Sequence, residues 1–439
     1  MDSAAAPVIM MLIMILGIVS GLPFVFVLGG TAVVATTLFW GWNALPQMVF
    51  QSYKVLEDFV FVAIPLYVLM AMILHKARLI EDMFDMIYKW SGPLRGGLAI
   101  GTELICAVFG ACTGIAGGTE TTMGLVALPN MRKYKYDLRL AAGTVLTGGT
   151  LGQLIPPSVL MVIYGLVSNV SVGKQFAGGI ATGMILVGLY IAYILIRCFL
   201  NKDLAPALPL GERATWREKF ISLKQVILPL ILILMVLGSV FTGVATPTEA
   251  AGMGVAGALF SAAVLRRLSW DLFKEATITT MRVSAVIGWI VVAASAFTNV
   301  YIIAGGEDFM RSLLTLLPGG KWGVLISTQV ILLVLGMILD TVAIVLICGP
   351  LFNSVMVSLG FDPVWFALLF MIQMQIAYIS PPFGYSLFYL YSVVPPDVKM
   401  NDLYKAAWPF IAVQILALAI FIIWPNTVLW LPNLLFKIE

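Results

Sequence analysis

The chain has 439 residues, of which 61% are hydrophobic and only 11% are charged, and its formal net charge is +3. Soluble proteins carry about 25% charged residues, so this composition excludes a soluble globular protein. Apolar runs long enough to cross a bilayer recur from end to end, which predicts an all-α polytopic membrane protein. We expect the lipid bilayer as its environment and no nucleic-acid partner.

The cysteines and the single histidine give no sign of a metal centre. The four cysteines lie in or beside apolar segments without paired spacing, so we expect buried free thiols rather than disulfides or metal ligands. His75 precedes Lys76 and Arg78 at the end of an apolar run, which is typical of a membrane edge. The first residues lack the basic region of a cleaved signal peptide, so we expect the first helix to be retained.

The first half contains several kinds of predicted element. Residues 79–90 carry apolar side chains at helical spacing with charges between them, which predicts an amphipathic helix on the membrane surface. Residues 98–131 are apolar but interrupted by Gly and Thr, and each flank is too short to span, which favours a re-entrant hairpin. The predicted crossings are helices at 7–20, 22–40, 57–76 and 175–198, with a loop at 40–46 and a broken helix at 138–168.

The break in residues 138–168 comes from a double proline. Pro156-Pro157 removes backbone donors and pushes Ile155 away from helical angles. Lipid cannot satisfy the carbonyls left without partners, so such a break persists only inside protein or beside a water-filled cavity.

The order of elements starts again after a polar stretch at residues 199–224. Pro23 and Pro247, Pro129 and Pro350, and Pro156 and Pro381 are separated by a nearly constant 221–225 residues. This spacing predicts two structural repeats, residues 1–198 and 225–439, joined by a basic cytoplasmic linker at 199–224. The second repeat is predicted to contain helices at 226–241, 250–265 and 282–303, an amphipathic segment at 307–317, a hairpin at 322–358, a helix over 363–393 broken at Pro381-Pro382, and a last helix at 406–432.

The positive charges predict the orientation. Five crossings per repeat, an odd number, would invert the second repeat relative to the first. With the linker inside, 20 of the 25 Lys and Arg residues lie on the cytoplasmic side and five lie outside. This is a strong positive-inside signal, and it predicts that both termini are periplasmic.

Each repeat would thus deliver a hairpin tip and a broken helix to the bilayer midplane. Free carbonyls and hydroxyls there suit Na⁺, and half-helix N-termini suit an anionic substrate. The candidate Na⁺ ligands are Thr113, Gly114, Thr119, Thr150, Gly152, Asp340, Thr341 and Ser380, and the candidate substrate contacts are Thr119, Glu120, Ser158, Ser380 and Gly384.

A structural alternative stands beside each candidate. Gly and Thr in membrane helices most often serve packing. An intramembrane carboxylate is costly, which favours a functional Asp340, whereas Glu120 leaves open a ligand role, a proton role and simple solvation. We expect Glu103 to make a structural hydrogen bond, and Glu249, after Thr246-Pro-Thr248, to cap a helix.

Four ordered motifs resemble a known family. Gly149-Thr-Leu-Gly-Gln-Leu-Ile-Pro-Pro-Ser158, Val244-Ala-Thr-Pro-Thr-Glu-Ala-Ala251, Asp340-Thr with Pro350, and Ser380-Pro-Pro-Phe-Gly384 are similar to the large membrane subunit of tripartite ATP-independent periplasmic (TRAP) transporters. The resemblance covers essentially the whole chain. It implies an ion-transporter-type elevator fold in the bacterial inner membrane, with a scaffold and a moving transport domain. It also implies a small four-helix membrane subunit, a periplasmic substrate-binding protein, and Na⁺-driven import of organic acids such as carboxylates or sulfonates.

The first hairpin departs from the family pattern. The family commonly has Ser-Gly-Ser and then Ala-Thr, whereas this chain has Thr113-Gly-Ile-Ala-Gly-Gly-Thr119-Glu120. The sequence here resembles the branch labelled mannitol/chloroaromatic. Only Thr113, Gly114 and Thr119 carry over as ligands.

The sequence therefore predicts the large subunit of a Na⁺-coupled importer, with no organic cofactor. A stand-alone Na⁺- or H⁺-coupled anion symporter of the same fold is the alternative. An intramembrane enzyme is disfavoured by the lone histidine and the missing His-Glu-x-x-His motif. Two opposed hairpins suit alternating access better than a channel.

Overall fold

The computed structural model describes residues 5–113, 117–209, 213–315 and 318–436, and every regular element within these ranges is a helix. Seven helices in the described part of the chain are long and apolar enough to cross a membrane. The prediction of an all-α polytopic membrane protein is confirmed.

The first half runs from the N-terminus to a long helix that precedes the linker. Its elements in chain order are α1 (Ala5–Val19), α2 (Phe24–Trp40), the 3₁₀ turn η1 (Trp42–Ala44), α3 (Leu45–Leu56), η2 (Phe59–Val62), α4 (Ala63–Lys76), α5 (Leu79–Ser91), α6 (Gly97–Thr113), α7 (Gly118–Lys133), α8 (Leu138–Thr150), η3 (Leu151–Gln153), α9 (Val159–Ser168) and α10 (Val172–Leu200).

The second half follows a short helix in the linker. Its elements are α11 (Trp216–Ser222), α12 (Lys224–Phe241), α13 (Pro247–Val264), α14 (Trp270–Ile303), α15 (Gly306–Thr315), α16 (Gly320–Ile338), α17 (Thr341–Ser358), α18 (Pro363–Ile379), α19 (Tyr385–Tyr391), α20 (Met400–Ile423) and α21 (Asn426–Leu435).

The two halves present their helices in the same order. Each half begins with two helices (α1–α2 or α12–α13) and a longer helical segment (α3–α4 or α14). These are followed by a short amphipathic helix (α5 or α15), a helical pair (α6–α7 or α16–α17), an interrupted helix (α8–α9 or α18–α19) and a long helix (α10 or α20). Both double prolines lie in the interruptions, and both contain a cis peptide bond. The inverted orientation of the halves and their boundaries at 1–198, 199–224 and 225–439 stay predictions.

Three elements differ from the sequence expectation. The loop expected at residues 40–46 ends early, and α3 forms from Leu45 to Leu56, because Pro46 lies in the first turn, where a missing N–H does no harm. Helix α14 begins at Trp270 rather than near residue 282, with Ser269 accepting a hydrogen bond from Leu272 N at its start. The last predicted helix is two helices, because Trp424 precedes Pro425 and leaves helical angles.

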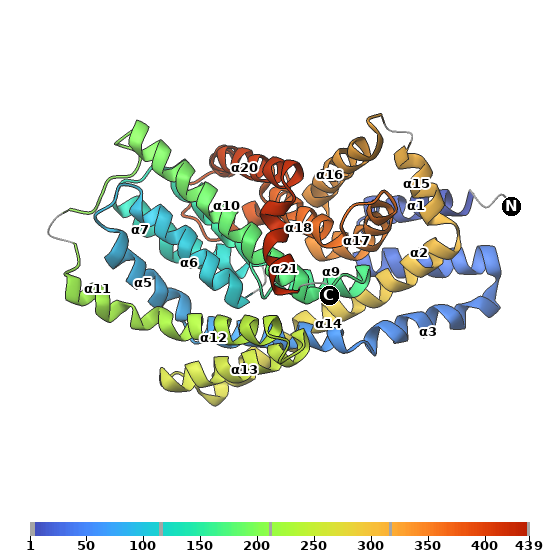
Figure 1. The fold of residues 1–439 in the computed structure, drawn as a ribbon, viewed down its shortest axis with the longest axis horizontal. Coiled ribbons are helices and arrows are strands. Elements are labelled where there is room, and N and C mark those ends of the chain that lie inside the picture. The colour runs from blue at the N-terminus through green and yellow to red at the C-terminus, as the bar shows by residue number, and fades with distance from the viewer. Residues whose placement is uncertain (1–4, 114–116, 210–212, 316–317, 437–439) are drawn as a thin grey trace.

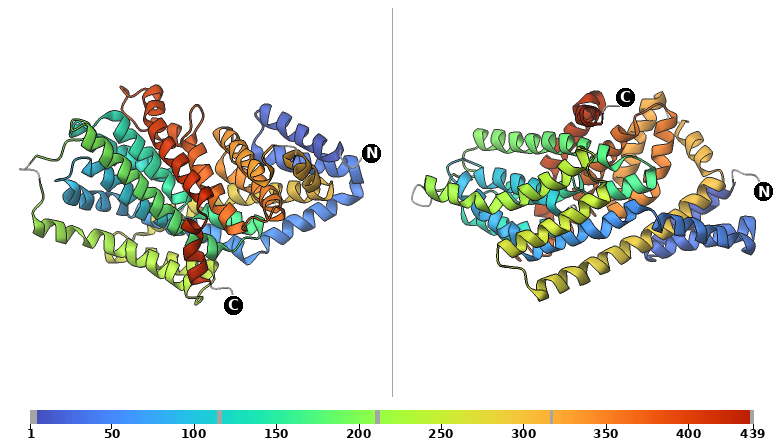
Figure 2. Two further views of the ribbon diagram at one scale, coloured as in Figure 1. Left: turned by 45° about the horizontal axis from the view of Figure 1, so that its top comes forward. Right: turned by 60° about the horizontal axis from the view of Figure 1, so that its bottom comes forward.

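The helical pairs lie on opposite sides of a central group formed by α10, α18 and α20 (Figure 1). In both views of Figure 2, the N-terminal helices lie at one end of the molecule and α6–α7 lie towards the other. Helices of the two halves pack against each other: α2 packs on α14, α4 on α13, α7 on α19 and α17 on α9. The 34 residues of α14 span about 51 Å, well beyond a bilayer core of about 30 Å, so this helix cannot lie upright within the core.

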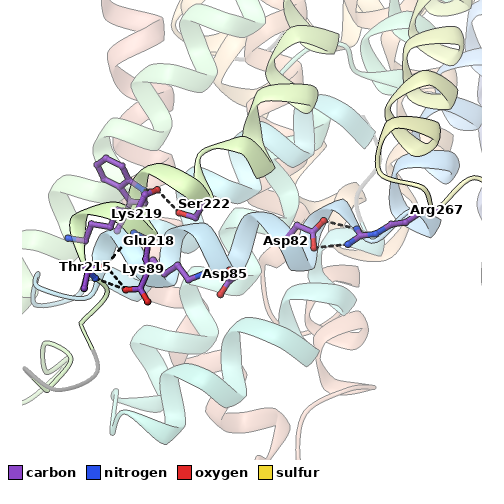
Figure 3. A network of polar contacts seen from close by, with 9 residues as sticks. Asp82, Asp85, Lys89, Thr215, Glu218, Lys219, Ser222 and Arg267 are labelled. Carbon is purple, nitrogen blue, oxygen red and sulfur yellow. Dashed lines mark hydrogen bonds and ion pairs between the residues drawn. The ribbon is translucent and has the colours of Figure 1, made fainter.

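A polar network fixes α5 to its neighbours (Figure 3). Arg267, between α13 and α14, donates two hydrogen bonds of 2.6 and 3.1 Å to Asp82 on α5. The same guanidinium donates to the backbone oxygen of Ala77 at the end of α4, at 2.8 Å. At the other end of α5, Trp90 Nε1 donates to the backbone oxygen of Lys219 in α11 at 2.9 Å. Contacts near both ends of α5 thus hold this amphipathic helix to its neighbours.

Candidate functional site

The first hairpin turns between α6 and α7. Gly117 precedes α7 with φ +92°, a conformation that favours glycine. Gly114 lies outside the described residues, and of Thr113 the structure gives only its place as the last residue of α6. The described part of this tip is residues 117–122.

Thr119 carries the available hydroxyl of the tip. Its side chain is buried, and its Oγ1 has no hydrogen-bond partner. By contrast, Thr121 Oγ1 donates to Gly117 O at 2.8 Å, and Thr122 Oγ1 donates to Gly118 O at 2.9 Å. Buried polar atoms are nearly always paired, so an orphan hydroxyl calls for an ion, water or ligand.

Glu120 joins three helices at the tip. Its carboxylate accepts hydrogen bonds from Gly117 N at 2.5 Å and from Ser386 Oγ of α19 at 3.2 Å. It is fully buried and packs on Gly149 of α8, where an added Cβ would collide with it. The carboxylate thus caps the first turn of α7 and ties that turn to both interrupted helices.

The first interrupted helix uses its own polar groups to shape the break. Thr150 Oγ1 donates to Thr147 O at 2.8 Å. Ser158 Oγ donates to Gln153 O at 2.7 Å and accepts from Met161 N at 3.4 Å, which caps α9. Gly152 lies against Gly110 of α6 so closely that a Cβ on Gly110 would stand 2.7 Å from its nitrogen. Of these predicted ligands, Ser158 is the one whose hydroxyl both donates and accepts locally.

The second hairpin and break are built in a similar way. Asp340 caps α17 by accepting from Val342 N at 3.0 Å, and Thr341 beside it is buried. Ser380 Oγ donates to Ile376 O at 2.6 Å, and Gly384 N donates to Ser380 O at 3.0 Å. A Cβ on Gly384 would stand 2.6 Å from the oxygen of Tyr378, so the loop after Ser380 closes only with glycine there.

A cluster of tyrosines lies at the second interruption, in α18 and α19. The rings of Tyr378 and Tyr385 stack with centroids 5.7 Å apart, and Tyr389 lies 6.5 Å from Tyr378. Tyr389 lies against the first tip, since a Cβ on Gly117 would stand 3.2 Å from its ring. The structure thus places the cluster beside the first hairpin. These rings were not among the residues predicted from the sequence, although the four-residue spacing of Tyr385 and Tyr389 places them on one helix face.

The first tip opens into a cavity of about 290 Å³. Gly117, Gly118, Thr121 and Thr122 line it, together with Tyr389 of α19 and His75 at the end of α4. His75, expected only to mark the membrane edge, therefore also faces the hairpin.

Two expected structural roles are confirmed. Glu103 is fully buried and accepts a hydrogen bond from Thr147 Oγ1 at 2.8 Å. Glu249 and Thr246 form a reciprocal capping box at the start of α13, with contacts of 2.8 and 3.3 Å.

A family model described as "Tripartite ATP-independent periplasmic transporter, DctM component" matches residues 8–427. The chain belongs to this family. The ectoine TRAP transporter large permease protein TeaC of Halomonas elongata is 27% identical over 91% of this chain and 92% of its own length. The C4-dicarboxylate large permease DctM of Pseudomonas aeruginosa is 28% identical over the same shares of the two chains.

A solved structure shows the same fold. The Alcanivorax borkumensis YdaH transporter aligns with a TM-score of 0.65 at 15% identity, covering 89% of this chain and 91% of that one. The DctM assignment makes this chain the large permease component of a multi-pass bacterial transporter and confirms the family resemblance. Membership of the mannitol/chloroaromatic branch stays a prediction.

Proposed function

We propose that this protein is the transport subunit of a Na⁺-coupled importer of small organic acids, working by an elevator motion. It acts with a four-helix membrane subunit and a periplasmic binding protein in the bacterial inner membrane, with both termini periplasmic. DctM membership supports the transport role and argues against catalysis, and the relatives' names connect this family with ectoine and C4-dicarboxylates.

The observation that carries the Na⁺ proposal is the unpartnered hydroxyl of Thr119. Na⁺ in such transporters is held by hydroxyls and by carbonyls that a helix interruption frees. Thr119, Thr150 and the partly exposed Asp340 offer oxygen atoms only, so the residues present fit the ion. We assign Thr113, Gly114, Gly152, Thr341 and Ser380 to the same ligand sets.

For the substrate, the proposed contacts are Thr119, Glu120, Ser158, Ser380 and Gly384. The hydroxyls of the clustered Tyr378, Tyr385 and Tyr389 add donors that suit a carboxylate or sulfonate. Bound Na⁺ would supply positive charge beside the two carboxylates, which explains why binding of ion and substrate would be coupled.

The test is uptake into proteoliposomes that contain this chain, its small subunit and its binding protein, with radiolabelled succinate and ectoine as probes. We expect uptake that needs an inward Na⁺ gradient and collapses when Na⁺ is equal on both sides. Equal uptake driven by a proton gradient alone would contradict Na⁺ coupling. Full uptake without the two partner proteins would instead establish the stand-alone symporter.

A further inference from the structure

A second and larger cavity lies away from the first hairpin tip. It has a volume of about 790 Å³ and is lined by Lys54 and Val55 at the end of α3, by Glu57 and Asp58 after it, by the end of α9, by α14 and by α17. Helix α17 packs on both α9 and α14 (Figure 1). It shares no described lining residue with the 290 Å³ cavity at the first tip. Its size is within the range of small-molecule sites, which often lie where two structural units meet.

The charged groups of this cavity are mostly acidic. Among the described lining residues, Glu57, Asp58 and Glu307 are acidic and Lys54 is the basic one. None of the four makes an ion pair among the salt bridges of the described residues. One oxygen of Asp58 accepts from Val60 N at 2.8 Å, which leaves its charge in place. By formal charge, the described lining therefore has an excess of two negative groups.

A buried hydroxyl with no partner also lines the cavity. Thr298 of α14 is 8% exposed, and its Oγ1 makes no hydrogen bond. Nearby, Asn353 of α17 donates from Nδ2 to Ser168 O at 3.2 Å, and Asn299 donates to Ser295 O at 2.9 Å, so both amide groups are held in place. An orphan buried hydroxyl in a polar cavity indicates a missing partner.

The lining segments come from regions that the charge distribution assigns to the outside. Lys54, the turn after α9 and the start of α15 all belong to the side with few basic residues. The cavity would then face the compartment from which an importer receives its substrate.

We propose that this cavity is an outer binding site for a small zwitterionic solute, with the cationic group held by Glu57, Asp58 and Glu307 and the solute carboxylate near Lys54. The negative excess favours such a solute over a dianion of similar size, because like charges repel where water is partly excluded. Only the statement that the cavity faces the compartment supplying the substrate rests on the proposed import function. The proposal narrows the substrate class to small zwitterionic solutes.

Binding is measured by calorimetry on the full-length protein in nanodiscs at low salt, without partner proteins and without a Na⁺ gradient. The probes are ectoine and glycine betaine as zwitterions and succinate as a dianion. We expect at least one zwitterion to bind more tightly than succinate. Glu307→Gln and Glu57→Gln should each weaken that binding about tenfold, since each removes a charged partner.

Asp308→Asn is the matched control, because Asp308 is exposed, adjacent to Glu307, and does not line the cavity. It should leave binding unchanged. Thr298→Val, which keeps the side-chain shape, is a second variant in case a charge change disturbs folding, and it should also weaken binding.

The proposal is overturned if neither zwitterion binds, if succinate binds as tightly, or if Glu307→Gln and Thr298→Val both leave binding unchanged. Because no gradient or partner is present, a failure of Na⁺-driven uptake does not affect this result. If uptake is normal but binding does not depend on the acidic residues of the cavity, only the cavity proposal is overturned.

Discussion

The Thr119→Val variant tests whether Thr119 is an ion ligand or a packing residue at the first tip. The valine keeps the shape of threonine and removes a hydroxyl that bonds to nothing in the protein. Because a buried unpaired hydroxyl costs about 1–3 kcal/mol, the variant should be as stable as the wild type or more stable when Na⁺ is absent. If Thr119 Oγ1 binds Na⁺, the loss of one ligand should raise the Na⁺ concentration for half-maximal uptake about tenfold, or about 1.4 kcal/mol.

Thr122→Val is the matched control. Its hydroxyl donates to Gly118 O at 2.9 Å on the same helix, so its removal should change stability only slightly and leave the Na⁺ requirement unchanged. The assays are melting temperature with and without Na⁺ and uptake against Na⁺ concentration. The reasoning is refuted if Thr119→Val melts lower than Thr122→Val in the absence of Na⁺ and needs no more Na⁺ than the wild type.

Three further predictions address the hairpins and the loops. Gly149→Ala should destabilise the protein by an overpacking cost of about 1–3 kcal/mol and so lower its melting temperature. Gly188→Ala is the control: its added methyl group meets nothing within 4 Å, so it should be neutral or stabilising. Equal melting temperatures of the two variants would contradict the close packing of Glu120 on α8. Asp340→Asn should keep α17 capped, since Asn caps as well as Asp, but weaken Na⁺ activation of uptake; unchanged activation would remove Asp340 from the ion site. The hydrogen bond from Arg132 lowers the pKa of Asp397 in the loop before α20, so this contact stabilises the protein above about pH 4 and is lost as pH falls through the lowered pKa. Asp397→Asn should flatten the acid side of melting temperature against pH, and an unchanged curve would argue against the contact.

Much of the fold could be predicted because local chemistry sets the ends of helices. Pro156-Pro157 and Pro381-Pro382 interrupt the helices where expected, and Asp340 and Glu249 occupy cap positions that their sequence neighbours dictate. The start of α3 was predicted wrongly from the same kind of local signal, a proline. Pro46 indicates a loop, yet proline is also tolerated in the first turn of a helix.

Less of the candidate site could be predicted. The sequence analysis placed Thr119 and Glu120 at a tip facing the first interrupted helix, and Gly149 of that helix does pack on Glu120. It did not place Ser386 there, because this residue lies 266 positions away and only the packing of α19 on α7 brings it to the carboxylate.

The sequence by itself determined that this protein spans a membrane, where its helices break, and which polar residues stand at the breaks. These features depend on backbone donors, proline and side chains a few residues apart. Only the tertiary structure decided that the second interrupted helix meets the first hairpin, that Tyr389 lies against the first tip, and that an acidic cavity forms among α3, α9, α14 and α17. Those relations depend on which distant helices pack together, and in lipid that choice is made by shape and small residues rather than by any pattern within one helix.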